Sequence, residues 1–255
     1  MTRIRPAEFQ INSGAQLAQG SVFAGLGRHT GSTYFHDSSL YKNHGTLTNM
    51  DPATDWVWVP KLGRWAVYLR GSPRYIGISP IVLSGSKTVS WWISYEALGY
   101  VLGGAGVHQY PYMNDNTLYV RDDVIAESAA HGGTASVWIH YAISGNEATV
   151  RYYRNGVQIA TDIPDPSPTV SRIATNEAGA SYLRGHLADL MVYKRVLSSA
   201  EIAHLADPSN VMLSGLILPP RRRVFLSAGA PPTGGLLRHR GMAGGMAELT
   251  GGIAG

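Results

Sequence analysis

The fold is decided by a stretch in the second half of the chain, which reads Ala148-Thr149-Val150-Arg151-Tyr152-Tyr153-Arg154-Asn155-Gly156-Val157-Gln158-Ile159-Ala160. Asn155 and Gly156 supply the two positive-φ positions of a type I′ turn, and β-branched and aromatic residues flank them on both sides. This stretch therefore predicts an antiparallel β-hairpin.

Strand-like runs surround the hairpin on both sides. Apolar and polar residues alternate with a period of two, as in half-buried strands, at residues 56–59, 64–70, 75–78, 88–94, 118–121, 137–143 and 186–193. We expect Trp56 and Trp58, which share one face of the first run, to lie in the core.

One short helix follows the last of these strands. Ser198 or Ser199 is its expected N-cap, Glu201 lies in its first turn, and Ile202 and Leu205 share one face. Many short strands with one short C-terminal helix predict an all-β fold, an antiparallel two-sheet sandwich with extended N- and C-terminal arms.

Three regions differ in composition: an N-terminal arm at residues 1–22, the sandwich at residues 23–206, and an Arg- then Gly-rich C-terminal arm at residues 207–255. Nine of the 27 residues from 229 to 255 are Gly, and such a tract buries too little apolar surface to offset its ordering entropy. We expect a neighbouring subunit to order this arm. The partner-binding residues would be a basic run and an added strand, namely Arg221, Arg222, Arg223, Val224, Phe225 and Leu226.

The positive charge of the chain also lies in this arm. Residues 216–255 hold five Arg, no Lys and one Glu, so they carry 5 − 1 = +4, which equals the formal charge of the whole chain. The remaining residues sum to zero, which argues against direct binding of nucleic acid. The absence of Cys excludes disulfides, thiolate metal sites and cysteine nucleophiles. No apolar run reaches 18 residues and no secretory signal is recognisable, so we expect neither membrane association nor secretion.

Five blocks of sequence occur in an order that points to a known family. They are Asp37-Ser38-Ser39 with Asn43-His44-Gly45-Thr46-Leu47, residues 66–71 with 75–78, residues 89–93, residues 138–142 with 153–156, and residues 185–202. Together they resemble the laminin G-like domains of the concanavalin A-like lectin/glucanase superfamily, over residues 30–206. The resemblance implies a concanavalin A-like jelly roll. It implies no single function, because this fold carries lectins, hydrolases, adhesion modules and structural proteins.

Catalysis finds no support in the sequence. Glycoside hydrolysis needs two carboxylates across a cleft, and the hydrolases of this fold share an E-x-D-x-E strand that is missing here. The closest acids, Asp122, Asp123 and Glu127, fit neither one strand face nor a helix turn. His140 lies inside a strand and is expected to be structural. We therefore expect no enzymatic activity.

Only the family resemblance suggests a calcium site, since many members of the family hold one ion at the rim of the sandwich. Calcium needs several oxygen ligands, and Asp37 and Asn43 match the first block of the family. The closing block has Ala188 where the family often has its first Asp, which leaves Asp189. Asp37 and Asn43 are candidate calcium ligands, and the favoured alternative is that they hydrogen-bond a turn. We expect no other cofactor.

A polar and aromatic loop is the candidate glycan site. Tyr110, Tyr112, Asn114 and Asp115 offer rings for stacking on a sugar and amide or carboxylate groups for its hydroxyls. The alternative is that the tyrosines pack the loop.

The first hypothesis is a non-enzymatic virion structural protein, a capsid decoration or a tail or fibre accessory protein, of the kind that laminin G-like domains resemble in tailed bacteriophages. Its partners would be other virion proteins and copies of itself, and it would assemble in the host cytoplasm. The alternative hypothesis is a lectin-like module that binds surface glycans.

Overall fold

The structure is a computed structural model, and it describes residues 10–11, 16–26, 32–105, 109–114, 117–121, 126–130, 132–162, 166–179, 181–209 and 217–218. The chain divides into two units, Met1–Arg221 and Arg222–Gly255, and every described residue belongs to the first.

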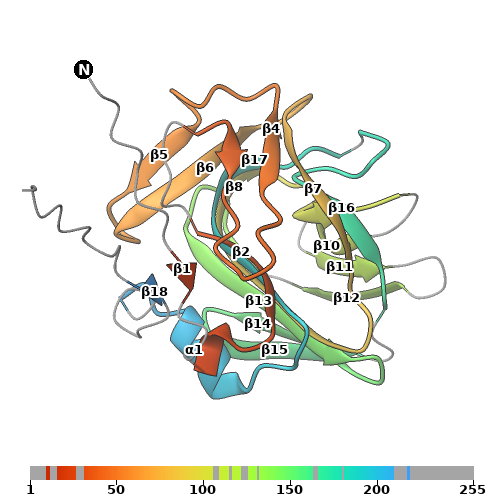
Figure 1. Ribbon diagram of the computed structural model, residues 1–255. Helices are drawn as coiled ribbons and strands as arrows, with labels where there is room; N and C mark the ends of the chain where they lie inside the picture. Colours follow the sequence, from red (N-terminus) through yellow and green to blue (C-terminus); the bar gives the residue numbers. More distant parts are fainter. Residues whose placement is uncertain are drawn as a thin grey trace, which may run out of the picture. The chain divides into compact units, whose positions relative to one another are not determined.

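Two antiparallel sheets form the body of the first unit (Figure 1). The first sheet has the strand order β15 (Val157–Asp162), β14 (Val150–Arg154), β13 (Ile139–Asn146), β8 (Ser86–Ala97), β17 (Arg184–Tyr193), β6 (Arg64–Arg70) and β5 (Trp56–Val59), and β2 (Ser21–Gly25) also pairs with β17. The second sheet has the order β12 (Ala126–Ala130), β11 (Thr117–Arg121), β10 (Gln109–Asn114), β9 (Leu102–Gly103), β16 (Thr169–Ile173), β7 (Tyr75–Val82), β4 (Gly45–Thr48) and β3 (Tyr34–Phe35). The predicted all-β antiparallel sandwich is confirmed.

The main core lies between the two sheets and follows from the alternation along each strand. Val89, Trp91 and Ile93 point inward from β8, and Ile76 and Ile78 point inward from β7; all five are buried in one cluster. The intervening residues of these strands face outward, so each sheet presents a second, outer face.

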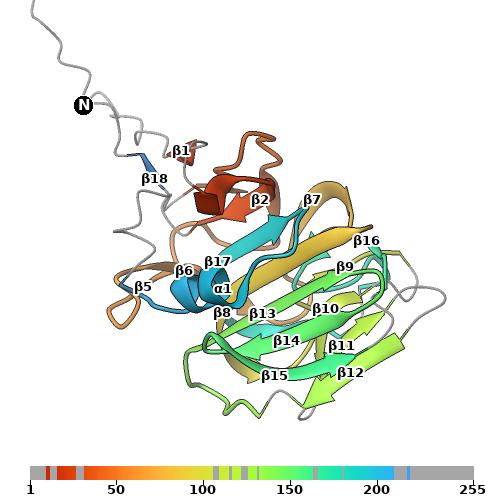
Figure 2. The same cartoon turned by 90° about the horizontal axis from the view of Figure 1, so that it is seen from below.

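The outer face of the first sheet carries the helix. Helix α1 (Ser199–Leu205) begins with a capping box, in which the Ser198 hydroxyl accepts from the Glu201 amide and the Glu201 carboxylate accepts from the Ser198 amide. Ile202 and Leu205 are buried against the sheet, in a cluster that includes Ala142. The predicted helix and its apolar face are confirmed, and Figure 2 shows α1 beside the strands of this sheet.

The hairpin forms as predicted. Asn155 and Gly156 have φ values of 49° and 81° and connect β14 to β15. Trp56 is buried and stacks on Phe35, with ring centroids 5.9 Å apart. Trp58 corrects the prediction: it shares the face of Trp56 but is 48% exposed, because it lies on the last strand of the sheet, beyond the edge of the core.

Segments from both ends of the chain meet outside the sandwich. β1 (Gln10–Ile11) pairs antiparallel with β18 (Ile217–Leu218), and the two labels lie together in both ribbon views. The body itself begins before residue 23, since Ala18 is buried and β2 starts at Ser21. Within the described ranges, no helix combines the length and the hydropathy that crossing a membrane requires.

Candidate functional site

The predicted glycan residues are separated by the structure. Tyr110 is fully buried in the main core, where its ring lies 5.5 Å from the Lys87 ammonium, so it offers no face to a sugar and that assignment is wrong. Tyr112 is half-buried and Asn114 is exposed at the end of β10. Asp115 lies outside the described residues.

A shift in strand register separates the two tyrosines. Residues two apart on a regular strand share a face, but β10 changes register against β11 between Gln109 and Tyr112. Tyr110 therefore points into the core while Tyr112 lies opposite Tyr119 of β11 on the outer face of the second sheet.

Tyr112 is the centre of an aromatic row on this outer face. Its ring centroid lies 4.7 Å from that of Tyr100 and 6.1 Å from that of Tyr119. Tyr100 is buried but belongs to none of the apolar core clusters, and Tyr112 and Tyr119 are half-buried. Offset aromatic contacts of this kind hold the rings in fixed orientations.

A polar chain extends the row across the sheet. Asn176, which is buried, donates from Nδ2 to the Tyr100 hydroxyl at 3.4 Å, and its backbone oxygen accepts from Arg172 Nη1 at 3.2 Å. The Arg172 guanidinium lies over the ring of Tyr75, 4.5 Å from the centroid. We call this set the tyrosine strip; it consists of Tyr75, Tyr100, Tyr112, Tyr119, Arg172 and Asn176.

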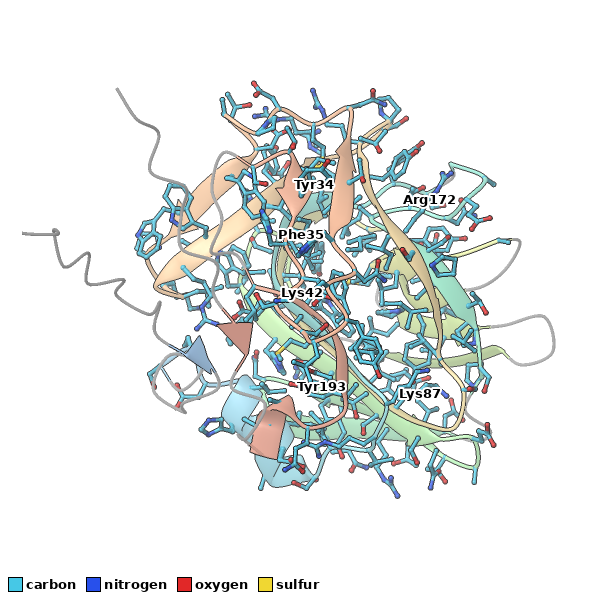
Figure 3. All side chains as sticks on the ribbon, in the orientation of Figure 1. Tyr34, Phe35, Lys42, Lys87, Arg172 and Tyr193 are labelled. Carbon is cyan, nitrogen blue, oxygen red and sulfur yellow. The ribbon has the colours of Figure 1, made fainter. Side chains whose placement is uncertain are left out.

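Two glycines shape the middle of the strip. A Cβ on Gly103 would lie 2.6 Å from the Thr175 carbonyl oxygen, so only glycine lets the loop with Asn176 pack so closely on β9. Gly77 pairs with Arg172 across β7 and β16, and a Cβ there would meet a single atom within 4 Å, on Tyr75. Figure 3 places Arg172 on the side of the molecule that β7 and β16 occupy.

The candidate calcium ligands are fully occupied by hydrogen bonds. Asp37 is buried; its Oδ1 accepts from the amides of Ala24 and Ser39, both at 2.8 Å, and its Oδ2 accepts from the Ser39 hydroxyl at 2.7 Å and the Asn43 amide at 2.9 Å. The Asn43 side chain bonds both backbone groups of Ser79, at 3.0 and 2.9 Å.

These oxygens do not fit a calcium ion, which would need lone pairs that already accept from the protein. Asp189, the remaining acid of the closing block, forms a buried ion pair with Arg64. Among the described residues, no group of three or more His, Cys, Asp or Glu side chains could hold a metal ion. We therefore correct the calcium assignment: Asp37 and Asn43 fold the loop.

His140 and Ser90 form a buried pair under the helix. His140 Nε2 lies 2.8 Å from the Ser90 hydroxyl, and the ring is 1% exposed. Burial and the nearby Arg64 charge lower the pKa of His140 to about 3. A base and a hydroxyl at this distance recur in nucleophilic catalysis, but a ring so buried has no access to a substrate, so the pair is structural.

The outer face of the first sheet also holds aromatic and charged groups, but these satisfy one another. Tyr68 stacks on His186 at 4.4 Å and donates to Glu96 at 3.2 Å. Glu96 pairs with Arg184 at 2.7 Å. These four side chains therefore bind one another.

The predicted partner-binding residues, Arg221, Arg222, Arg223, Val224, Phe225 and Leu226, lie outside the described residues. Their contacts stay a prediction.

Residues 70–203 match the family model described as the Concanavalin A-like lectin/glucanases superfamily. The chain belongs to this superfamily. No relative was found among the curated proteins.

Solved structures of low identity share the lectin-like fold. The binding domain of Paraclostridial Mosquitocidal Protein 1 has a TM-score of 0.55 and 15% identity, over 76% of this chain and 53% of that one. Domain 4 of AbnA, a GH43 extracellular arabinanase from Geobacillus stearothermophilus solved with arabinotriose, has a TM-score of 0.53 and 19% identity, over 72% of this chain and 100% of that one. Botulinum neurotoxin type C, whose cell entry depends on interaction with two ganglioside molecules, has a TM-score of 0.51 and 11% identity, over 74% of this chain and 51% of that one. The lectin-like domain thus spans about half the length of the toxin chains that it matches.

Sequence reasoning missed most of the tyrosine strip. Only Tyr112 was singled out. The other members come from segments far apart in the chain that the sheet brings together, namely Tyr75, Tyr100, Tyr119, Arg172 and Asn176. The local signal that could have found further members was alternation with core residues, of Tyr119 with Leu118 and Val120 and of Tyr75 with Ile76.

Proposed function

We propose that this lectin-like domain binds carbohydrate, without catalysis, on the outer face of its second sheet. The tyrosine strip carries the proposal. Sugars bind proteins by placing their apolar C–H faces on aromatic rings while a few polar groups orient their hydroxyls. Tyr112 and Tyr119 provide half-buried rings, and Asn114 and Arg172 provide polar groups on the same sheet.

The similarity to other lectin-like domains supports this choice. The arabinanase domain was solved with arabinotriose, and the whole of that domain aligns with this chain. The neurotoxin of type C interacts with gangliosides. At identities of 19% and 11%, these similarities support a shared fold but not a shared ligand. The ligand proposed for this chain therefore rests on the tyrosine strip.

The proposal includes no reaction, because glycoside hydrolysis would need two facing carboxylates. In the described part of the strip's surroundings, the nearest carboxylate in sequence is Glu177, which accepts from the Ser171 hydroxyl at 2.5 Å. A carboxylate tied to a neighbouring strand residue is poorly placed to exchange protons with a substrate.

A second candidate function is that of a virion structural protein, a capsid decoration or tail accessory protein held through its arms. The pairing of β1 with β18 favours it, because it joins short segments of the N- and C-terminal arms. The Gly-rich composition of residues 229–255 also suits a segment that is ordered by a partner. The two functions are compatible, since a decoration protein can carry a glycan-binding face.

A glycan array with purified protein tests the first function. We expect saturable binding to at least one class of oligosaccharide, with at least a tenfold loss for Tyr112→Ala and Tyr119→Ala. Tyr41→Ala is the matched control, because Tyr41 is 68% exposed and is not a member of the strip, so its replacement should leave binding unchanged. Absence of binding across the array, or equal losses in all three variants, would overturn the proposal.

A further inference from the structure

Arg172 differs in its contacts from the four arginines of the body that pair with carboxylates. Ion pairs with carboxylates are formed on or next to the first sheet by Arg64, Arg70, Arg184 and Arg195. Arg172 lies on the second sheet, and among the described residues its guanidinium makes one hydrogen bond, to the backbone oxygen of Asn176.

The environment of Arg172 holds the charge in place without neutralising it. Its guanidinium carbon lies over the ring of Tyr75, 4.5 Å from the centroid, and this cation–π contact helps to fix its position. The neighbouring carboxylate of Glu177 is engaged by Ser171. A half-buried guanidinium with one of its five donors used is a strong site for a planar anion, because a carboxylate can accept two parallel N–H bonds from it.

The register partner of Arg172 on β7 has no side chain. Gly77 is its register partner on β7, and Thr46, the partner of Gly77 on β4, is exposed. Glycine at position 77 places no side chain between Arg172 and Thr46 on this face. A ligand group that contacts Arg172 would therefore reach solvent across β7 and could continue along the strip toward Tyr112.

We propose that Arg172 makes the tyrosine strip selective for acidic saccharides, those that carry a carboxylate such as a uronic acid. The carboxylate would accept two hydrogen bonds from the guanidinium, while an adjacent sugar ring would stack on Tyr112 or Tyr119. This inference rests on the proposed carbohydrate binding and names its ligand class.

Isothermal titration calorimetry with a matched pair of ligands tests this inference. The probes are an oligogalacturonide and its fully methyl-esterified form, which differ in charge but share the sugar backbone. We expect the acid to bind at least tenfold more tightly than the ester. Arg172→Gln should remove that difference by weakening binding of the acid at least tenfold more than binding of the ester. Arg172→Lys should restore part of it, because a lysine keeps the charge but loses the paired donors.

Two control variants separate the possible failures. Arg151→Gln changes a half-buried arginine on β14 of the first sheet and should leave both affinities unchanged. Tyr112→Ala should weaken acid and ester alike. Equal affinities for acid and ester in the wild type, with both lost in Tyr112→Ala, would overturn the acidic selectivity and leave carbohydrate binding intact. Failure of both ligands to bind, with no glycan found on the array, would overturn both proposals.

Discussion

Asp37 shows at the scale of a single residue how a family motif can be structural. Its two carboxylate oxygens accept four hydrogen bonds, and three of the donors are backbone amides. These amides all donate to the same carboxylate, which stabilises the conformation of the loop from Asp37 to Asn43.

Replacing Asp37 with Ala should lower the free energy of unfolding by about 3 kcal/mol, because buried amides lose a charged acceptor. Asn43→Ala, which removes two exposed hydrogen bonds to Ser79, should cost about 1 kcal/mol. Urea unfolding measures both. Calcium added to the wild-type protein should leave its midpoint unchanged; a calcium-dependent rise that Asp37→Ala abolishes would restore calcium to this site.

His140 should make the protein sensitive to acid. Its pKa is about 3 in the folded state, because burial and the Arg64 charge disfavour the protonated ring, and about 6.5 in an unfolded chain. Between these values the unfolded chain binds a proton that the folded protein does not. Its contribution to stability is therefore complete above pH 6.5 and decreases as the pH falls toward 3, by at most about 1.4 kcal/mol per pH unit.

The test is urea unfolding of the wild type and His140→Gln from pH 7 to pH 4. The variant should be less stable at pH 7 but should lose less stability on acidification. His186→Gln is the comparison variant: burial also lowers the pKa of His186, but its ring is half-exposed and its effect should be smaller. Parallel curves for wild type and His140→Gln would contradict this assignment.

At the scale of elements, the β14–β15 hairpin and α1 depend on each other. Gly156 has a φ of 81°, and a Cβ there would lie 2.8 Å from the Cα of Ala203 in the helix. Gly63, in the turn between β5 and β6, has a φ of 63° but nothing within 4 Å of its missing Cβ. A Cβ at Gly63 would therefore add backbone strain alone, whereas a Cβ at Gly156 would add backbone strain and a steric clash with the helix.

Gly63→Ala should cost about 1 kcal/mol, the cost of left-handed backbone for a residue with a Cβ. Gly156→Ala should cost about 3 kcal/mol, because the added methyl group also displaces the helix. Thermal unfolding of both variants measures the difference. Equal losses would show that the hairpin turn and α1 are not in contact.

The elements were predictable where the signal was local. The Asn155-Gly156 turn and the cap at Ser198 depend on residues next to each other, and both formed as expected. Tyr110 failed because a register shift between Gln109 and Tyr112 interrupts the alternation, and such shifts leave no clear mark in sequence. Trp58 was placed on the right face but at the wrong depth, since alternation does not say which strand lies at an edge.

The site was less predictable than the elements, for a topological reason. Arg172 contacts Tyr75 because β16 pairs with β7, and β9 lies between β16 and β10, the strand that carries Tyr112. These neighbours are distant in the chain, so periodicity within one segment does not reveal them. The family resemblance predicted the fold, but it did not predict the tyrosine strip, which depends on side chains specific to this chain.

At the scale of the whole molecule, the sandwich and the C-terminal unit should be separable. The main core, the helix and the paired sheets all lie within Met1–Arg221. A chain that ends at residue 221 should therefore unfold at the same urea concentration as the full chain.

The same truncation tests whether residues 222–255 of the C-terminal arm anchor the protein. Multi-angle light scattering should show self-assembly of the full chain that the truncated chain lacks, and replacing Arg221, Arg222 and Arg223 with Ala should weaken assembly more at low than at high salt. Normal assembly of the truncated chain would contradict the role of the arm. Loss of folding on truncation would instead make residues 222–255 part of the body.

The central claim is that the outer face of the second sheet binds carbohydrate, and NMR chemical-shift mapping during titration with an oligosaccharide found on the array tests it most directly. The account predicts shifts concentrated on β7, β10, β11 and β16, around Tyr75, Tyr112 and Arg172, which disappear in Tyr112→Ala. Shifts confined to the first sheet or to the Leu40–Tyr41 loop, with the tyrosine strip unperturbed, would contradict it.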